Sequence, residues 1–302
     1  MASIITNTSA QIALRSLSMT NAALEKTQQR ISTGLRVGTA EDNAAYWSIA
    51  TTMRSDRSAL NTVKDALGLG AATVDVAYTG MNSAIDVVKE IKNKLVAARQ
   101  PGVDRAKVQT EISELQNQLV NIGDSSVFSN ENWLSVDSSA ASFNATKTIV
   151  ASFARSGGAV SVGTISIDIT NVKLFDASGA ATGILDELNG TYSVSTLSIA
   201  ALTDSAADLT TLEGMITWTD DAISSMTTSA ATLGSAKQRV NLQKDFVGSL
   251  MDAIDRGIST LVDADMTEES TKLQALQVQQ QLGTQALSIA NQSSQSILSL
   301  FR

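Results

Sequence analysis

The 302-residue sequence contains no cysteine and no histidine. Without cysteine there are no disulfide bonds and no thiol nucleophiles, and the two absences together remove the usual ligands of a zinc site. Histidine is also the commonest general acid and base in enzymes, so catalysis would have to rest on carboxylates, lysine, serine or tyrosine. We therefore expect neither an enzyme nor a protein with a bound metal or cofactor.

Proline and aromatic residues are scarce. A single proline permits long uninterrupted helices, and an aromatic content of 4% requires cores built from Leu, Ile, Val, Met and Ala. The formal net charge of −8 argues against a nucleic-acid partner, because such proteins present a basic surface. The sequence has no nearly continuous apolar run of about 18 residues, so we expect no membrane span. Its first residues lack the basic and apolar regions of a cleaved signal peptide.

Between Lys272 and Arg302 the sequence contains no charged residue, yet it is too polar for a membrane span. Apolar residues recur there at intervals of eleven, which is about three helical turns, so each series runs nearly straight along a helix. The two series lie on roughly opposite sides. They consist of Leu276, Leu287 and Leu298 on one side and Val278, Ile289 and Leu300 on the other. A helix that is apolar on two faces and uncharged between them is suited to being enclosed.

The N-terminal segment carries a matching pattern at intervals of seven. One stripe contains Ile5, Ile12 and Met19, and the other contains Leu17, Leu24 and Ile31. One stripe on each terminal helix could bind the other end of the same chain. The second stripe requires another partner, and identical copies are the simplest candidate. We therefore predict a polymerisation interface made of these N-terminal and C-terminal residues together with Leu282.

Two long heptad repeats lie between the terminal helices. The first consists of Leu60, Leu67, Val74, Met81, Val88 and Leu95, and the second of Met226, Leu233, Val240, Val247, Ile254 and Leu261. Small residues beside the first repeat, among them Gly70, indicate close approach of a neighbouring helix. Thr39 and Asp42 resemble a capping box at the start of this helix.

The section between residues 136 and 204 has a different composition. β-Branched residues alternate there with a change of phase at Gly163, as in strands, and Ser-Gly pairs indicate turns. We therefore expect a mainly α fold, a long antiparallel coiled-coil helical bundle made from the N- and C-terminal halves, with a small β-rich central insertion. The expected domains are residues 1–40 with 262–302, residues 41–135 with 205–261, and the insertion at 136–204.

Several motifs resemble those of bacterial flagellin. They are ISTGLRVGTAEDNAA at residues 31–45, LGSAKQR at 233–239, VDADMTEE at 262–269, LGTQAL at 282–287, ANQ at 290–292 and LSLFR at 298–302. The resemblance covers about residues 1–135 and 205–302, and Tyr46-Trp47 is similar to the alphaproteobacterial members. Gly38 departs from the family, many members of which have asparagine there.

The resemblance implies a structural subunit of the bacterial flagellar filament, with further copies of itself and sister flagellins as partners. It implies export through the flagellar type III apparatus without a cleaved signal peptide, and therefore an extracellular location. A chaperone that binds the C-terminal segment, the filament cap and the hook-associated junction proteins would be further partners. The terminal helices would form the inner tube of the filament, the heptad helices a surrounding layer, and the insertion the outer surface.

Three other functions share features with this sequence. A hook–filament junction protein shares the terminal pattern but does not polymerise indefinitely. A filament-borne peptidase would need a His-Glu-x-x-His helix, which a sequence without histidine does not supply. A secreted adhesin would act as a monomer. The acidic cluster of Asp263, Asp265, Glu268 and Glu269 lacks the spacing of a calcium-binding loop, and we interpret it as a solvated start of the last helix.

Overall fold

The structure is a computed structural model that describes residues 7–141, 143–178 and 181–300, with side chains described as far as residue 292. Within these residues the chain forms five helices and six short or medium strands, so the predicted mainly α fold with a small β-containing region is confirmed. No helix in this part of the chain is long and apolar enough to cross a membrane. The chain divides into two compact units, residues 1–58 with 252–302 and residues 59–251.

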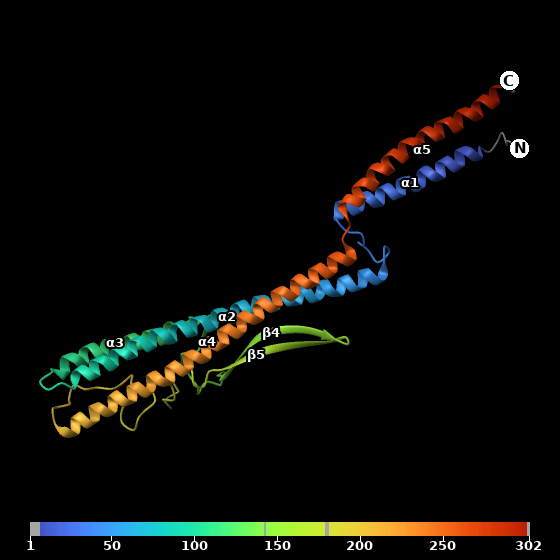
Figure 1. The fold of residues 1–302 in the computed structure, drawn as a ribbon. Coiled ribbons are helices and arrows are strands. Elements are labelled where there is room, and N and C mark those ends of the chain that lie inside the picture. Colours follow the sequence, from blue (N-terminus) through green and yellow to red (C-terminus); the bar gives the residue numbers. More distant parts are fainter. Residues whose placement is uncertain (1–6, 142, 179–180, 301–302) are drawn as a thin grey trace. The chain divides into compact units, whose positions relative to one another are not determined.

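The first unit contains an antiparallel pair of helices, α1 (Thr8–Thr33) and α5 (Met266–Leu300) (Figure 1). Asn7 caps the start of α1, where its side chain accepts a hydrogen bond of 3.0 Å from a backbone N–H in the first turn. Gly34 ends α1 in the left-handed conformation, with φ at 71°, which glycine adopts without a steric cost. Asp265 caps α5 in the same way as Asn7 caps α1.

The two chain segments at the base of this pair are hydrogen-bonded to each other. The backbone N–H of Arg36 donates to the carbonyl of Val262 (2.7 Å), and the N–H of Ala264 donates to the carbonyl of Gly34 (2.9 Å). A small apolar cluster made of Val37, Ala50, Ile258 and Val262 lies beside these bonds. The loop that follows α1 and the loop that precedes α5 are therefore held side by side.

The helix that follows, α2 (Ala44–Ala98), is capped by Asn43, whose side chain accepts a hydrogen bond of 3.1 Å from the first turn. The predicted contact between Thr39 and Asp42 is present, since the backbone N–H of Thr39 donates to the Asp42 carboxylate (3.4 Å), but it closes the loop before α2 and does not cap the helix. Asp42 turns back toward α1 and forms an ion pair of 2.8 Å with Lys26. The hydrogen bond from Lys26, with two more from backbone N–H groups of the loop, lowers the pKa of Asp42 to about 2.

The second unit is built on the remaining part of α2, on α3 (Arg105–Ser125) and on α4 (Ala206–Val262). The heptad positions of α2 are at most 2% exposed, and the four heptad positions of α4 in this unit are at most 1% exposed, so both repeats form packing seams as predicted. Ion pairs join α2 to its neighbours at the surface. They link Asp75 to Lys237, Lys92 to Asp220 and Lys94 to Glu111.

The insertion contains one long hairpin, β4 (Thr146–Ser156) and β5 (Ala159–Asp168), which lies beside the helices of this unit (Figure 1). Gly157 and Gly158 form its turn with positive φ angles of 58° and 86°. The register of the two strands shifts between Val150 and Ser152, opposite the glycine at which the sequence predicts a change of phase. Two smaller pairs complete the strands: β1 (Val127–Phe128) with β2 (Glu131–Asn132), and β3 (Ser135–Val136) with β6 (Phe175–Asp176).

The hairpin, not a helix, covers the small residue Gly70 of α2. A Cβ atom placed on Gly70 would lie 2.5 Å from the Cγ2 of Ile149 in β4, so the strand approaches the helix directly over the glycine. The close approach predicted at Gly70 is present, but the prediction that a helix makes it is wrong, because the neighbour is a strand. Gln243 of α4 also holds the hairpin by donating a hydrogen bond of 2.9 Å to the carbonyl of Ala151.

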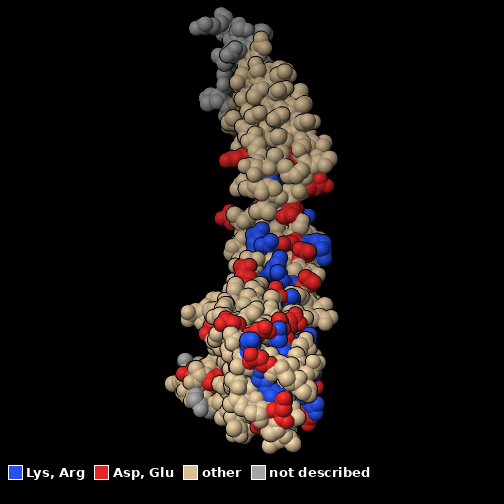
Figure 2. Space-filling model, turned by 90° about the vertical axis from the view of Figure 1, so that its left-hand side faces the viewer, with Lys and Arg blue, Asp and Glu red and all other residues tan. Residues whose placement is uncertain are grey.

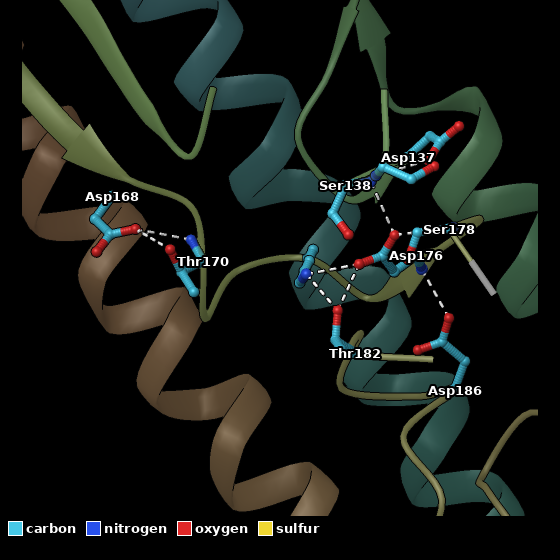
Figure 3. Close-up of polar contacts among 10 residues, drawn as sticks. Asp137, Ser138, Asp168, Thr170, Asp176, Ser178, Thr182 and Asp186 are labelled. Atoms are coloured by element: carbon cyan, nitrogen blue, oxygen red, sulfur yellow. Dashed lines mark hydrogen bonds and ion pairs between the residues drawn. The ribbon is translucent and has the colours of Figure 1, made fainter. Parts of the chain in front are cut away.

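A buried polar network joins the segment around Ser138 to residues 173–186 of the insertion (Figure 3). The carboxylate of Asp176 accepts hydrogen bonds from the ammonium group of Lys173 (2.7 Å) and from the backbone N–H groups of Ser138 (3.0 Å) and Ser178 (3.1 Å). Asp186 in turn accepts from the backbone N–H of Asp176 (2.7 Å). The donors around Asp176 outweigh its burial and hold the pKa of its carboxyl far below the usual range.

Candidate functional site

The terminal helix pair covers one of its two apolar stripes within the chain. Leu17, Leu24 and Ile31 of α1 are half-buried, as are Leu276 and Leu287 of α5. The helices approach closely at Gly283, where an added Cβ atom would lie 3.2 Å from the Cδ1 of Leu17. The sequence pattern assigns these five residues to the polymerisation interface, and it does not indicate which stripe of each helix binds within the chain; in the structure they lie half-buried in the single chain.

The second stripe of each helix is open to solvent. The exposed fractions are 71% for Ile12, 68% for Met19, 54% for Val278, 58% for Leu282 and 67% for Ile289. Several large apolar side chains with this exposure on one helix pair are unusual unless another molecule covers them. Three further predicted interface residues, Ile5, Leu298 and Leu300, have side chains outside the described part of the chain.

The sequence pattern missed one member of this surface. Leu14 of α1 is 57% exposed, yet it belongs to neither heptad stripe. Its only sequence signal is its position between Ile12 and Met19 in a segment with few charges. We define the apolar surface as the exposed apolar side chains of both helices, namely Ile12, Leu14, Met19, Val278, Leu282 and Ile289. Because Leu14 and Ile12 are two residues apart, this surface extends around α1 beyond the predicted stripe.

Charge is sparse on this part of the first unit. Arg15 is the one charged residue of α1 before Glu25, and α5 has none after Lys272. On the face that Figure 2 shows, the part of the unit next to the grey chain ends is entirely tan, while red and blue residues gather further from the ends. Copies of this surface can therefore approach one another with little electrostatic repulsion.

The acidic cluster at the start of α5 directs its carboxylates to separate partners. Asp263 accepts from Ser259 (2.5 Å), Asp265 caps α5, and Glu269 pairs with Arg30 of α1 at 2.8 Å. The backbone N–H groups of the first turn of α5 lower the pKa of Asp265. In the part of the chain that the structure describes, no three carboxylates come together as metal ligands.

Comparison with known proteins identifies the family. The model of the bacterial flagellin N-terminal helical region matches residues 4–139, and the model of the C-terminal helical region matches residues 216–301. The chain belongs to the bacterial flagellin family. It is 51% identical to Flagellin C and 44% identical to Flagellin A of Rhizobium meliloti (strain 1021), and 47% identical to a flagellin of Brucella melitensis. Each of these alignments covers 100% of both chains.

Membership of this family establishes the class of the protein. This flagellin is a structural subunit of the bacterial flagellar filament and is not an enzyme. The resemblance drawn from the sequence motifs is confirmed, including its alphaproteobacterial character, because the relatives come from Rhizobium and Brucella. None of these relatives supports the alternative of a hook–filament junction protein in particular.

Proposed function

We propose that this flagellin polymerises through the outward apolar surface of α1 and α5, with each subunit covering the surface of its neighbours. The supporting observation is the exposure of 54–71% for large apolar side chains on the parts of α1 and α5 that lie nearest the chain ends, where the only charged residue before Glu25 in α1 is Arg15 and α5 has none after Lys272. The inward stripes pair α1 with α5 and form one body, and the outward surface gives that body its affinity for further copies. A contact that joins two different patches head to tail generates an open helical polymer when the rotation between subunits does not close into a ring.

We propose further that residues 1–40 with 262–302 form the inner tube, that 41–135 with 205–261 form the layer around it, and that 136–204 face outward. The distribution of charge supports this order. The heptad helices carry surface ion pairs suited to a wet environment, such as Lys92 with Asp220, whereas the apolar surface needs enclosure. Sister flagellins would share the same terminal contacts and copolymerise.

The remaining partners are proposed from the family alone. We propose that the chain is exported without a cleaved signal peptide to an extracellular filament, that a chaperone holds its C-terminal segment before export, and that the filament cap and junction proteins bind its terminal helices. An uncharged segment with apolar side chains such as Val278 and Ile289 requires such cover before assembly.

Seeded polymerisation tests the proposed surface. The variant Ile12→Asp places a charge at the most exposed position of the surface, and Leu188→Asp makes the same kind of change at a side chain of the insertion that is 58% exposed. We expect no elongation of seeds by the first variant and normal long filaments from the second. Normal filaments from Ile12→Asp would contradict the proposal, and loss of filaments in both variants would show that the effect is not specific to the apolar surface.

A further inference from the structure

One ion pair crosses the interface between the terminal helices. Within the described residues of α1 and α5, the only ion pair between them joins Nη1 of Arg30 to Oε1 of Glu269 at 2.8 Å. Glu269 is 6% exposed, and neither its Oε2 nor the Nε of Arg30 has a hydrogen-bond partner in the structure. The side chain of Arg30 is 23% exposed, so the pair is half-buried, and with unsatisfied atoms it contributes little net stability, because desolvation offsets the attraction. Its best-attested use is to specify one packing arrangement among several.

Besides this pair, the backbone bonds between residues 34–37 and 262–264 and the bond from Asn7 to the carbonyl of Ala290 (3.0 Å) join the two segments, but the side-chain contacts along the helices distinguish registers weakly. If α1 slipped by seven residues, Leu24 would take the place of Leu17 opposite Gly283, so a leucine would occupy that place before and after the slip. The side-chain contact between Gln280 and Asn21 (2.8 Å) is equally replaceable, because α5 has several further glutamines nearby. Neutral polar contacts and repeated leucines therefore distinguish weakly between the two registers.

The ion pair distinguishes them strongly. After a slip of seven residues, Val37, which lies beyond the end of α1, would take the place of Arg30, and Glu269 would lose its charged partner at that place. An unpaired buried carboxylate is strongly unfavourable. A slip of this size also displaces α1 by about 10 Å along α5. Ile12 and Met19 would then no longer lie level with their present neighbours on α5.

We propose that Arg30 and Glu269 set the register of α1 against α5, and that they are the specificity-determining residues that align the outward apolar surface for polymerisation. This inference rests on the proposed function of that surface. The pair acts as a positioning device, and its charge complementarity matters more than its contribution to stability.

Engineered disulfides measure the register directly, because the chain has no cysteine of its own. A Cβ at Gly283 would lie 3.8 Å from the Cβ of Leu17, which matches the usual separation in a disulfide. The pair Leu17→Cys with Gly283→Cys therefore reports the native register. The pair Leu24→Cys with Gly283→Cys reports a slip of seven residues. With native charges, we expect mild oxidation to link the first pair and not the second.

The charge of the pair is then varied in both reporters. We expect Arg30→Glu to reduce the native crosslink at least fivefold, to raise the slipped crosslink, and to abolish seeded growth of the parent chain without cysteines. Adding Glu269→Arg to Arg30→Glu should return the native crosslink and the growth of filaments. Lys26→Glu is the matched control, because Lys26 pairs with Asp42 outside α5, and it should leave the ratio of the two crosslinks unchanged.

The outcomes separate this inference from the proposed function. An unchanged crosslink ratio in Arg30→Glu would overturn the inference and would assign the register to the backbone bonds at Gly34 and Ala264. Failure of the exchanged pair to restore the native crosslink would overturn it as well. If the crosslinks respond as expected while Ile12→Asp still forms filaments, the register inference stands and the proposed polymerisation surface fails.

Discussion

Replacing Ile289 with aspartate tests whether the outward face of α5 is covered by other subunits in the filament. The expected loss of free energy of subunit addition can be estimated from the exposure of this side chain. Ile289 is 67% exposed in the single chain. Full burial of an isoleucine is worth roughly 1.5–3 kcal/mol, so covering the exposed part contributes about 1–2 kcal/mol per subunit. An aspartate would lose this contribution and would bring an unpaired carboxylate into an apolar contact, at a cost of about 3–5 kcal/mol.

The two effects together weaken subunit addition by about 4–7 kcal/mol, which raises the critical concentration for polymerisation by a factor of about 10³ or more. The assay is seeded growth followed by sedimentation over a range of subunit concentrations. The conservative variant Ile289→Leu is the control, and it should stay within about tenfold of the parent chain, because such swaps usually cost less than ~1.5 kcal/mol.

Leu287 provides a second comparison, because it is half-buried against α1. We expect Leu287→Asp to abolish filaments too, but with loss of helix content in the monomer, whereas Ile289→Asp should leave the circular dichroism of the monomer unchanged. A critical concentration for Ile289→Asp close to that of the parent chain would refute the reasoning. So would a loss of monomer helicity in that variant, since the effect would then not lie in the contacts between subunits.

Three further predictions concern the stability of the subunit. The ion pair with Lys26 depresses the pKa of Asp42 to about 2, so the stabilising contribution of this carboxylate is complete above pH ~4 and is lost as the pH falls through 2. The thermal unfolding temperatures of the parent chain and of Asp42→Asn should therefore converge as the pH is lowered over that range. A difference that stays constant with pH would contradict this prediction. Gly70→Ala should destabilise the subunit by about 1–3 kcal/mol through a clash with the hairpin. Gly68 has open space around it, so Gly68→Ala should stabilise the subunit by up to about 1 kcal/mol. A denaturant titration of both variants measures the two changes, and equal effects would refute the close contact between Gly70 and the hairpin. Asp176→Ala should lower the free energy of unfolding by about 3–5 kcal/mol because it leaves Lys173 buried without a counter-ion, and a change below about 1 kcal/mol would show that the network is not structural.

The long helices and the surface of the terminal pair could be predicted because their signals are local and repeated. Leu67 and Met81 occur at heptad positions, and both are fully buried. The distinction between the inward Leu17 and the outward Met19 follows from the same periodicity, since residues two apart on a helix point to different sides. A chain with one proline leaves these periodic patterns uninterrupted over many turns.

The features that could not be predicted depend on pairings between distant or irregular segments. Arg30 and Glu269 are separated by 239 residues, and nothing in either local sequence indicates the other. The small residue Gly70 indicates that something approaches closely, but not that Ile149 of a hairpin does so. The capping role of Asn43 cannot be predicted from sequence, because the neighbouring Asp42 has the same capping propensity. Only the structure shows that Asp42 pairs with Lys26 instead.

The accessibility of Met19 before and after assembly tests the central claim most directly. In the variant Met19→Cys the chain gains a single thiol at a position that is 68% exposed in the monomer, and cysteine keeps the site apolar. We expect maleimide to label this thiol rapidly in the monomer and at least a hundredfold more slowly in the filament, while Leu188→Cys reacts at similar rates in both states. Equal labelling of Met19→Cys in monomer and filament would contradict the account, because the apolar surface would then remain uncovered in the polymer.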